Sequence, residues 1–219
     1  YQNIFKNPLA APDLIGVANG AAAGAAFSIV CLHGGTILAA GSSFVGGITA
    51  VAAVVVLAGF VRQRTSATYV LAGIAVKAAA EAFVMAMKYF ADPDKQLSAI
   101  DYWAMGSFAN ITMDKLRVIF PVFLAGFIGI ILLRWQITLL SLGDDEARML
   151  GMRVNLVRCI VLGFSTLLVA STVCVTGIIS FIGLVAPHIA RMLLKKSDFG
   201  TCILSGLTGA SIMMAADCF

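Results

Sequence analysis

Two charged side chains stand one helical turn apart in an otherwise apolar part of the sequence. Lys77 and Glu81 fall in a predicted helix over residues 69–90, whose only other charged residue is Lys88, near its end. A charged side chain at the centre of a bilayer costs about 3 kcal/mol on insertion scales, so such groups normally face protein or a water-filled path. A spacing of four residues also lets the two pair with each other. The pattern fits a polar lining of a translocation pathway or a proton relay, and it also fits a mutually neutralising pair buried between helices.

A second polar cluster lies in the segment L-G-D-D-E-A-R-M-L-G, residues 142–151. Acidic side chains are favoured at the start of a helix by the helix dipole, and glycines commonly bound short helices. The segment therefore predicts one or two turns of amphipathic helix, which either docks a soluble partner or merely joins two membrane spans. The residues concerned are Gly143, Asp144, Asp145, Glu146, Arg148, Leu150 and Gly151.

The sequence contains few residues that could catalyse a reaction or bind a metal ion. His33 and His188 are the only histidines and are expected on opposite sides of the membrane, which excludes a histidine-based zinc site. No Walker A phosphate loop occurs, so the chain is not expected to hydrolyse ATP by itself. We expect no catalytic residue, no metal site and no cofactor in this chain.

Three glycines, Gly16, Gly20 and Gly24, recur at every fourth residue. Small residues at this spacing let helix backbones approach closely within a membrane. The ladder predicts tight helix packing on one helix face and does not by itself indicate a function.

The composition shows what kind of chain must position these residues. Charged residues make up 12% of the 219 residues, hydrophobic residues 60%, and the mean hydropathy is +0.98. Ordinary soluble domains carry about 25% charged residues. The composition excludes an ordinary cytosolic enzyme, a disordered tail and a nucleic-acid-binding module, and predicts a polytopic membrane protein.

The apolar segments predict about seven transmembrane helices. Residues 14–61 contain no Asp, Glu, Lys or Arg, and this stretch is too long for one helix across a hydrocarbon core of about 30 Å. We expect the break between two spans within residues 33–43, where glycine and serine cluster. The expected spans are 14–32, 43–61, 69–90, 114–133, a helix to about Thr176, a shorter helix from a turn at Gly177 to about Leu194, and a last helix from about Thr201.

Lysine and arginine set the expected orientation, because they are enriched on the cytoplasmic side. One set of connections carries ten of them and the other carries four. We therefore expect 62–68, 134–158 and 195–200 to be cytoplasmic, and 91–113 to be external. The ten are Lys6, Arg62, Arg64, Arg134, Arg148, Arg153, Arg158, Arg191, Lys195 and Lys196.

Five motifs in series carry a family resemblance. They are N-P-L-A with the following P-x-L-I-G-V-x-N-G-A (7–21), L-A-G-I-A (71–75), Y-W-A-M-G-S (102–107), G-D-D-E-A-R-M-L-G (143–151) and G-I-I-S-F-I-G-L-V-A-P-H-I-A-R (177–191). In this order they resemble the FecCD-like, type II permeases of ABC importers for ferric siderophores, haem and cobalamin. The resemblance covers nearly the whole chain.

The resemblance implies a fold and a set of partners. The fold is a ten-helix, all-α subunit, of which residues 1–219 would be one incomplete permease domain, from the end of the second helix into the ninth. The implied partners are a second permease copy in a homodimer or pseudodimer, two ABC ATPase subunits that bind ATP and Mg²⁺, an extracytoplasmic substrate-binding protein and membrane lipid, with no nucleic acid. The implied location is a bacterial or archaeal cytoplasmic membrane.

The resemblance also implies roles for the two polar clusters. Residues 141–155 would form the segment that couples the permease to the ATPase, with Asp145, Glu146, Arg148 and Leu150 as contacts. Gly73, Lys77 and Glu81 would belong to the pathway-lining helix. The alternative is an ATP-independent carrier or channel that uses Lys77 and Glu81 as its ion-coupling site. An intramembrane protease would need paired aspartates on facing helices, and Asp217 is the only Asp well inside an expected span.

Overall fold

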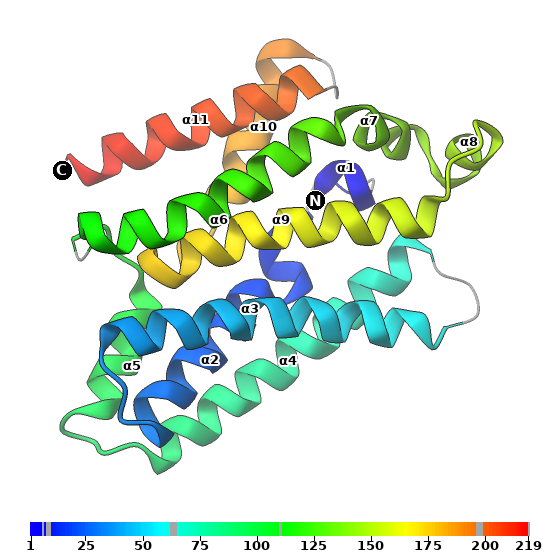
Figure 1. Cartoon of the computed structure of the whole chain (residues 1–219). Coiled ribbons are helices and arrows are strands. Elements are labelled where there is room, and N and C mark those ends of the chain that lie inside the picture. Colours follow the sequence, from blue (N-terminus) through cyan, green and yellow to red (C-terminus); the bar gives the residue numbers. More distant parts are fainter. Residues whose placement is uncertain (6, 8–9, 62–64, 110, 196–198, 219) are drawn as a thin grey trace.

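A computed structural model describes residues 1–5, 7, 10–61, 65–109, 111–195 and 199–218 (Figure 1). These residues form eleven α-helices and one short 3-10 helix, and no β-strand occurs among them. The elements are α1 (Gln2–Phe5), η1 (Pro12–Ile15), α2 (Val17–Cys31), α3 (Thr36–Gly59), α4 (Ser66–Phe90), α5 (Gln96–Met105), α6 (Met113–Leu132), α7 (Arg134–Leu142), α8 (Asp144–Met149), α9 (Val154–Thr176), α10 (Ile182–Leu194) and α11 (Phe199–Asp217). The all-α prediction is confirmed.

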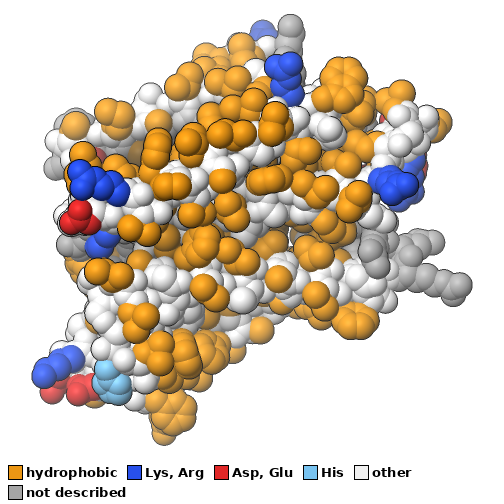
Figure 2. Space-filling view, in the orientation of Figure 1, with side chains coloured by type: hydrophobic (Ala, Val, Ile, Leu, Met, Phe, Trp, Pro, Cys, Tyr) orange, Lys and Arg blue, Asp and Glu red, His pale blue; other side chains and the backbone are white. Residues whose placement is uncertain are grey.

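The long helices run between two ends of the molecule (Figure 1). Five of them, α3, α4, α6, α9 and α11, are long and apolar enough to cross a membrane. Figure 2 shows hydrophobic side chains over the broad middle of the surface, with the charged side chains gathered mainly towards its margins. The chain is therefore a multi-pass membrane protein.

The two remaining predicted spans are helices that are shorter than the other five. α2 has 15 residues and α10 has 13. At 1.5 Å per residue they reach only about 20 Å, less than a hydrocarbon core of about 30 Å. The interruption predicted before α10 is confirmed: Gly177 has a φ of 73° and no helix follows until Ile182.

The predicted break between the first two spans was partly wrong. α3 begins at Thr36, so Gly41, Ser42 and Ser43 lie inside the helix rather than in a turn. The reason is packing against α2: a Cβ atom added at Gly24 would lie 2.1 Å from the Ser42 carbonyl oxygen. Small residues that suggested a turn instead let two backbones approach closely.

The glycine ladder needs a similar correction. Gly20 and Gly24 lie in α2, but Gly16 lies outside it, with a φ of 76° between η1 and α2. A Cβ atom at Gly20 would lie 2.4 Å from Ala50 Cβ and 2.6 Å from the Gly46 carbonyl oxygen. Two of the three glycines therefore pack α2 on α3, and the third turns the chain into α2.

Two connections contain more helix than the sequence analysis predicted. The expected external segment 91–113 holds α5, at the end of the molecule opposite α8 (Figure 1). The expected cytoplasmic connection 134–158 holds α7 in addition to the predicted short helix, α8, and it ends early because α9 begins at Val154. Arg158 therefore belongs to a helix and not to a loop. Of the residues used for orientation, Lys6, Arg62, Arg64 and Lys196 lie outside the described residues.

Candidate functional site

The candidate site is built around α8, at the end of the molecule predicted to be cytoplasmic. Two glycines in conformations that disfavour other residues bound this six-residue helix: Gly143 has a φ of 145° and Gly151 a φ of 81°. Asp144, Asp145 and Glu146 fill its first turn, where the helix dipole favours negative charge. The predicted short helix within 142–151 is confirmed.

One face of α8 is exposed and mixes charge with apolar surface. Met149 is 81% exposed and Leu150 63%, whereas Ala147 is fully buried. Arg148 Nη1 lies 3.5 Å from Asp145 Oδ1 within the same helix, and both side chains are more than half exposed. Apolar and charged groups on an exposed end are suited to contact with another protein.

Asp144 points the other way, into the protein. Its Oδ1 accepts a hydrogen bond of 2.5 Å from Arg158 Nη2 on α9, and the Arg158 side chain is fully buried. The sequence analysis placed Asp144 with the other α8 residues and Arg158 in a loop, and it missed this pair. The only signal in the sequence was an arginine immediately before the long uncharged run 159–190.

The same guanidinium group contacts the beginning of α4. Arg158 Nη2 also donates to Ser66 Oγ at 3.2 Å, and Arg158 Cζ lies 5.6 Å from the centre of the Tyr69 ring. Tyr69 is almost fully buried, and its Oη lies 3.7 Å from Cys159 Sγ. Arg158 therefore joins α8, α9 and the first turn of α4.

Lys77 and Glu81 lie further along α4, as the sequence predicted, and face each other. Lys77 Nζ lies 3.8 Å from Glu81 Oε1, and their side chains are 37% and 53% exposed. Asn19 Nδ2 on α2 donates to the same carboxylate oxygen at 2.9 Å. The pairing is thus observed, and the pair is open on one side of the helix.

Gly73 lies one turn before Lys77 and is buried against η1. A Cβ atom added there would lie 2.4 Å from the Leu14 carbonyl oxygen and 2.9 Å from Ile15 Cα. In this chain Gly73 thus makes a packing contact, which fixes α4 against η1. Its predicted place in a pathway stays a prediction.

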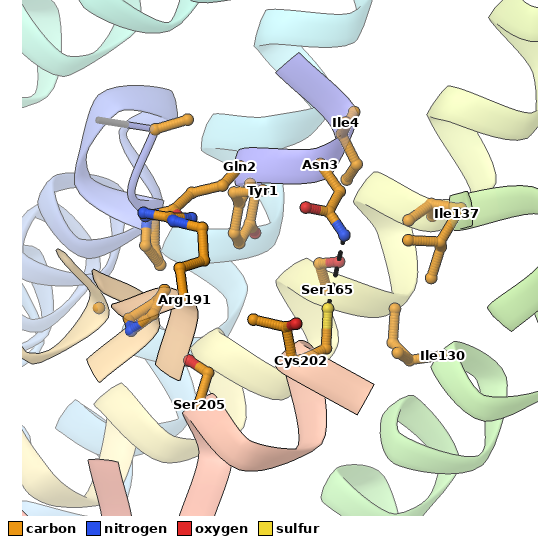
Figure 3. Close-up of a pocket in the computed structure, with 16 residues that line it drawn as sticks. Tyr1, Gln2, Asn3, Ile4, Ile130, Ile137, Ser165, Arg191, Cys202 and Ser205 are labelled. Atoms are coloured by element: carbon orange, nitrogen blue, oxygen red, sulfur yellow. Dashed lines mark hydrogen bonds between the residues drawn. The ribbon is translucent and has the colours of Figure 1, made fainter. Parts of the chain in front are cut away.

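A separate cleft of about 280 Å³ lies between α1, α9, α10 and α11 (Figure 3). Asn3 Nδ2 donates to Cys202 Sγ at 3.5 Å across it, and Arg191 Nη1 donates to Gln2 Oε1. Tyr1 Oη lies 3.5 Å from Thr166 Oγ1. These contacts attach the short α1 to three other helices.

The two histidines do not come together. His33 lies between α2 and α3 and His188 lies in α10, and both are exposed. Within the part of the chain that the structure describes, no three His, Cys, Asp or Glu side chains are grouped so that they could hold a metal ion.

Comparisons with known proteins agree with this architecture. The molybdate import system permease protein MolB of Haemophilus influenzae is 33% identical over 222 residues, which cover 99% of this chain and 64% of that protein. The hemin transport system permease protein HmuU of Yersinia pestis is 34% identical over 220 residues, covering 99% of this chain and 66% of that protein. A solved structure of a metal-chelate type ABC transporter, in an inward-facing conformation, superposes with a TM-score of 0.89 at 31% identity and covers 99% of this chain and 69% of that one.

The fold and the site define a helical, multi-pass membrane protein with a short exposed helix at one end. The sequence model of the FecCD transport family matches residues 1–219, and the chain belongs to that family. It spans about two thirds of the length of the curated relatives named here.

Proposed function

We propose that this chain forms most of a permease subunit of an ATP-driven ABC importer, and that α8 is its contact with the ATPase. The observation that carries the proposal is the exposed α8, bounded by two positive-φ glycines, in a chain of the FecCD family. The partners are a second permease copy, two ABC ATPase subunits that bind ATP and Mg²⁺, and an extracytoplasmic substrate-binding protein. The location is a bacterial or archaeal cytoplasmic membrane.

The mechanism follows from the position of α8 between α7 and α9. ATP binding closes the ATPase dimer, which then pushes on α8. This push tilts the long helices that end beside α8. The path then opens alternately to the two sides of the membrane by rigid-body movement. Lys77, Glu81 and Gly73 belong to the helix that lines this path.

The substrate class is a metal chelate or a related anion. The named relatives are permease proteins of a molybdate import system and of a hemin transport system, and the solved structure is described as being of metal-chelate type. A half-exposed ammonium and carboxylate on α4 suit a polar or charged substrate better than an uncharged one. Ferric siderophore, haem, corrinoid and molybdate are the candidates.

The test is co-purification of the ATPase with the full-length parent protein in mild detergent. Arg148→Glu is expected to reduce ATPase recovery at least about tenfold, since it reverses a charge at the centre of the contact. Arg117→Glu is the matched control, because Arg117 also makes an exposed pair within its own helix, 3.8 Å from Asp114, but at the opposite end of the molecule. Equal recovery from both variants would overturn the role of α8.

Uptake measurements separate the importer from the ion-coupled carrier. Membrane vesicles loaded with or without ATP are offered ferric hydroxamate, haemin, cobalamin and molybdate with the binding protein. An importer takes up one of them only with ATP. Uptake that persists without ATP and collapses with the proton gradient, from a preparation that recovers no ATPase, would establish the carrier that uses Lys77 and Glu81.

A further inference from the structure

We infer that Arg158 is a positioning residue that transmits movement of α8 to the beginning of α4. The inference rests on the proposed function of α8 and adds to it the route by which the push reaches the pathway helix. Helices α4, α8 and α9 meet at this one side chain, and α4 is distant in sequence from the other two.

The geometry places a single nitrogen between two helix starts. Arg158 Nη2 donates to Asp144 Oδ1 at 2.5 Å and to Ser66 Oγ at 3.2 Å. Asp144 is the first residue of α8 and Ser66 the first of α4. Figure 1 shows α8 at the same end of the molecule as the starts of α4 and α9. A displacement of α8 therefore acts directly on the group that holds the start of α4.

Burial makes this contact costly to break. The Arg158 side chain is fully buried, and its Nε and Nη1 have no hydrogen-bond partner among the described residues. In the described part of the chain, Asp144 is the one carboxylate within 4 Å of this guanidinium. Removing one partner of a buried ion pair is strongly destabilising, because the other charge is left without compensation. Movement of α8 together with α9 and α4 is therefore favoured over separation.

The α4 side of the contact is rigid as well. The Tyr69 ring lies against the guanidinium, and α4 continues without interruption from Ser66 to Phe90. Lys77 and Glu81 are carried on this helix. A tilt applied to the first turn of α4 consequently displaces the polar pair.

The experiment uses the full-length permease with its ATPase and binding protein in liposomes. Arg158→Lys keeps the charge, Arg158→Met keeps the apolar stem without the charge, and Asp144→Asn removes the acceptor charge. The readout is uptake per ATP hydrolysed, with ferric hydroxamate, haemin, cobalamin and molybdate as probes. Arg117→Met is the control for a charge loss remote from α8.

We expect Arg158→Met and Asp144→Asn to bind the ATPase and hydrolyse ATP, but to lower uptake per ATP roughly tenfold, the effect of losing a charge-assisted contact. Arg158→Lys should retain most of the coupling and Arg117→Met all of it. If Arg158→Met couples as well as Arg158→Lys, the side chain serves packing only and the inference fails.

Hydrogen exchange of the backbone amides in residues 144–149 measures how firmly α8 is held to the rest of the permease, and it needs no ATPase or binding protein. In purified full-length protein, exchange should be roughly tenfold faster in Arg158→Met and Asp144→Asn than in Arg117→Met. Equal exchange in all three would overturn the inference. Failure of the unmodified protein to recover an ATPase, with fast exchange still seen in Arg158→Met, would overturn the docking role of α8 while supporting its attachment to α4 through Arg158.

Discussion

Two ion pairs are associated with α4, one within the helix and one at its start, and they differ in the distance between the charges and in burial. At its start, Arg158 and Asp144 lie 2.5 Å apart with the arginine fully buried. Near its middle, Lys77 and Glu81 lie 3.8 Å apart with 37% and 53% of their side chains exposed. A buried charge depends on its partner, whereas exposed pairs contribute about 0–1 kcal/mol. The first pair therefore joins three helices, whereas the second is half exposed on α4, the helix that our proposal places beside the path.

The comparison is tested most strongly by removing one cation from each pair. Arg158→Met should lower the free energy of unfolding by about 3 kcal/mol, because Asp144 loses its partner in a largely buried site. Lys77→Met should change it by less than about 1 kcal/mol, because the proposed path gives the exposed pair access to water. Thermal unfolding of the detergent-solubilised full-length protein measures both.

A double variant checks the cause of the larger effect. Combining Arg158→Met with Asp144→Asn removes both charges, so at least half of the lost stability should return. Additive losses in the double variant would mean that charge pairing is not what stabilises this junction.

The second prediction concerns what positions the exposed pair. Gly73→Val should cost about 2 kcal/mol, because the added atoms meet backbone that has little freedom to move. The nearest atom is the Leu14 carbonyl oxygen, 2.4 Å from the new Cβ. Ala75→Val, at an exposed position half a turn away, is the control. Equal losses in the two variants would show that packing of α4 on η1 does not place Lys77 and Glu81.

Most of the helices could be predicted from the sequence, and the errors have a common physical origin. Long apolar runs determine a helix by themselves, which is why α4, α6 and α11 were predicted to within a few residues. Glycine and serine are ambiguous, since they favour turns and also allow close helix contacts. Residues 41–43 were therefore assigned to a turn, although they lie in α3 and the backbone of Ser42 and Ser43 packs against Gly24.

The site was predictable only where its residues are close in sequence. Lys77 and Glu81 are four residues apart, and the α8 glycines and acids are contiguous, so local spacing was sufficient. Arg158 is separated from Ser66 by two membrane spans and the connections between them, and no local pattern indicates that contact. The role that we infer for Arg158 depends on contacts that form only when α4, α8 and α9 are packed together.

A smaller effect is expected from removing the Ser66 hydroxyl group. This group accepts a hydrogen bond from Arg158 Nη2, the nitrogen that also donates to Asp144. Ser66→Ala should cost about 1 kcal/mol, the typical contribution of one hydrogen bond. Ser98→Ala, at an exposed position of α5, is the matched control and should have no measurable effect. If Ser66→Ala behaves like Ser98→Ala in thermal unfolding, the hydrogen bond from Arg158 to Ser66 does not help to place Arg158.

The smallest expected effect is a difference in how the two ion pairs respond to salt. At 1 M ionic strength the Debye length is about 3 Å, so exposed charges are screened whereas buried ones are not. The difference in unfolding temperature between the unmodified protein and Glu81→Gln should be small in dilute buffer and should vanish at 1 M salt. The difference for Arg158→Met should persist, because water and ions do not reach that side chain. A salt-sensitive loss at Arg158, or a salt-resistant one at Glu81, would reverse the assignment of the structural and the exposed pair.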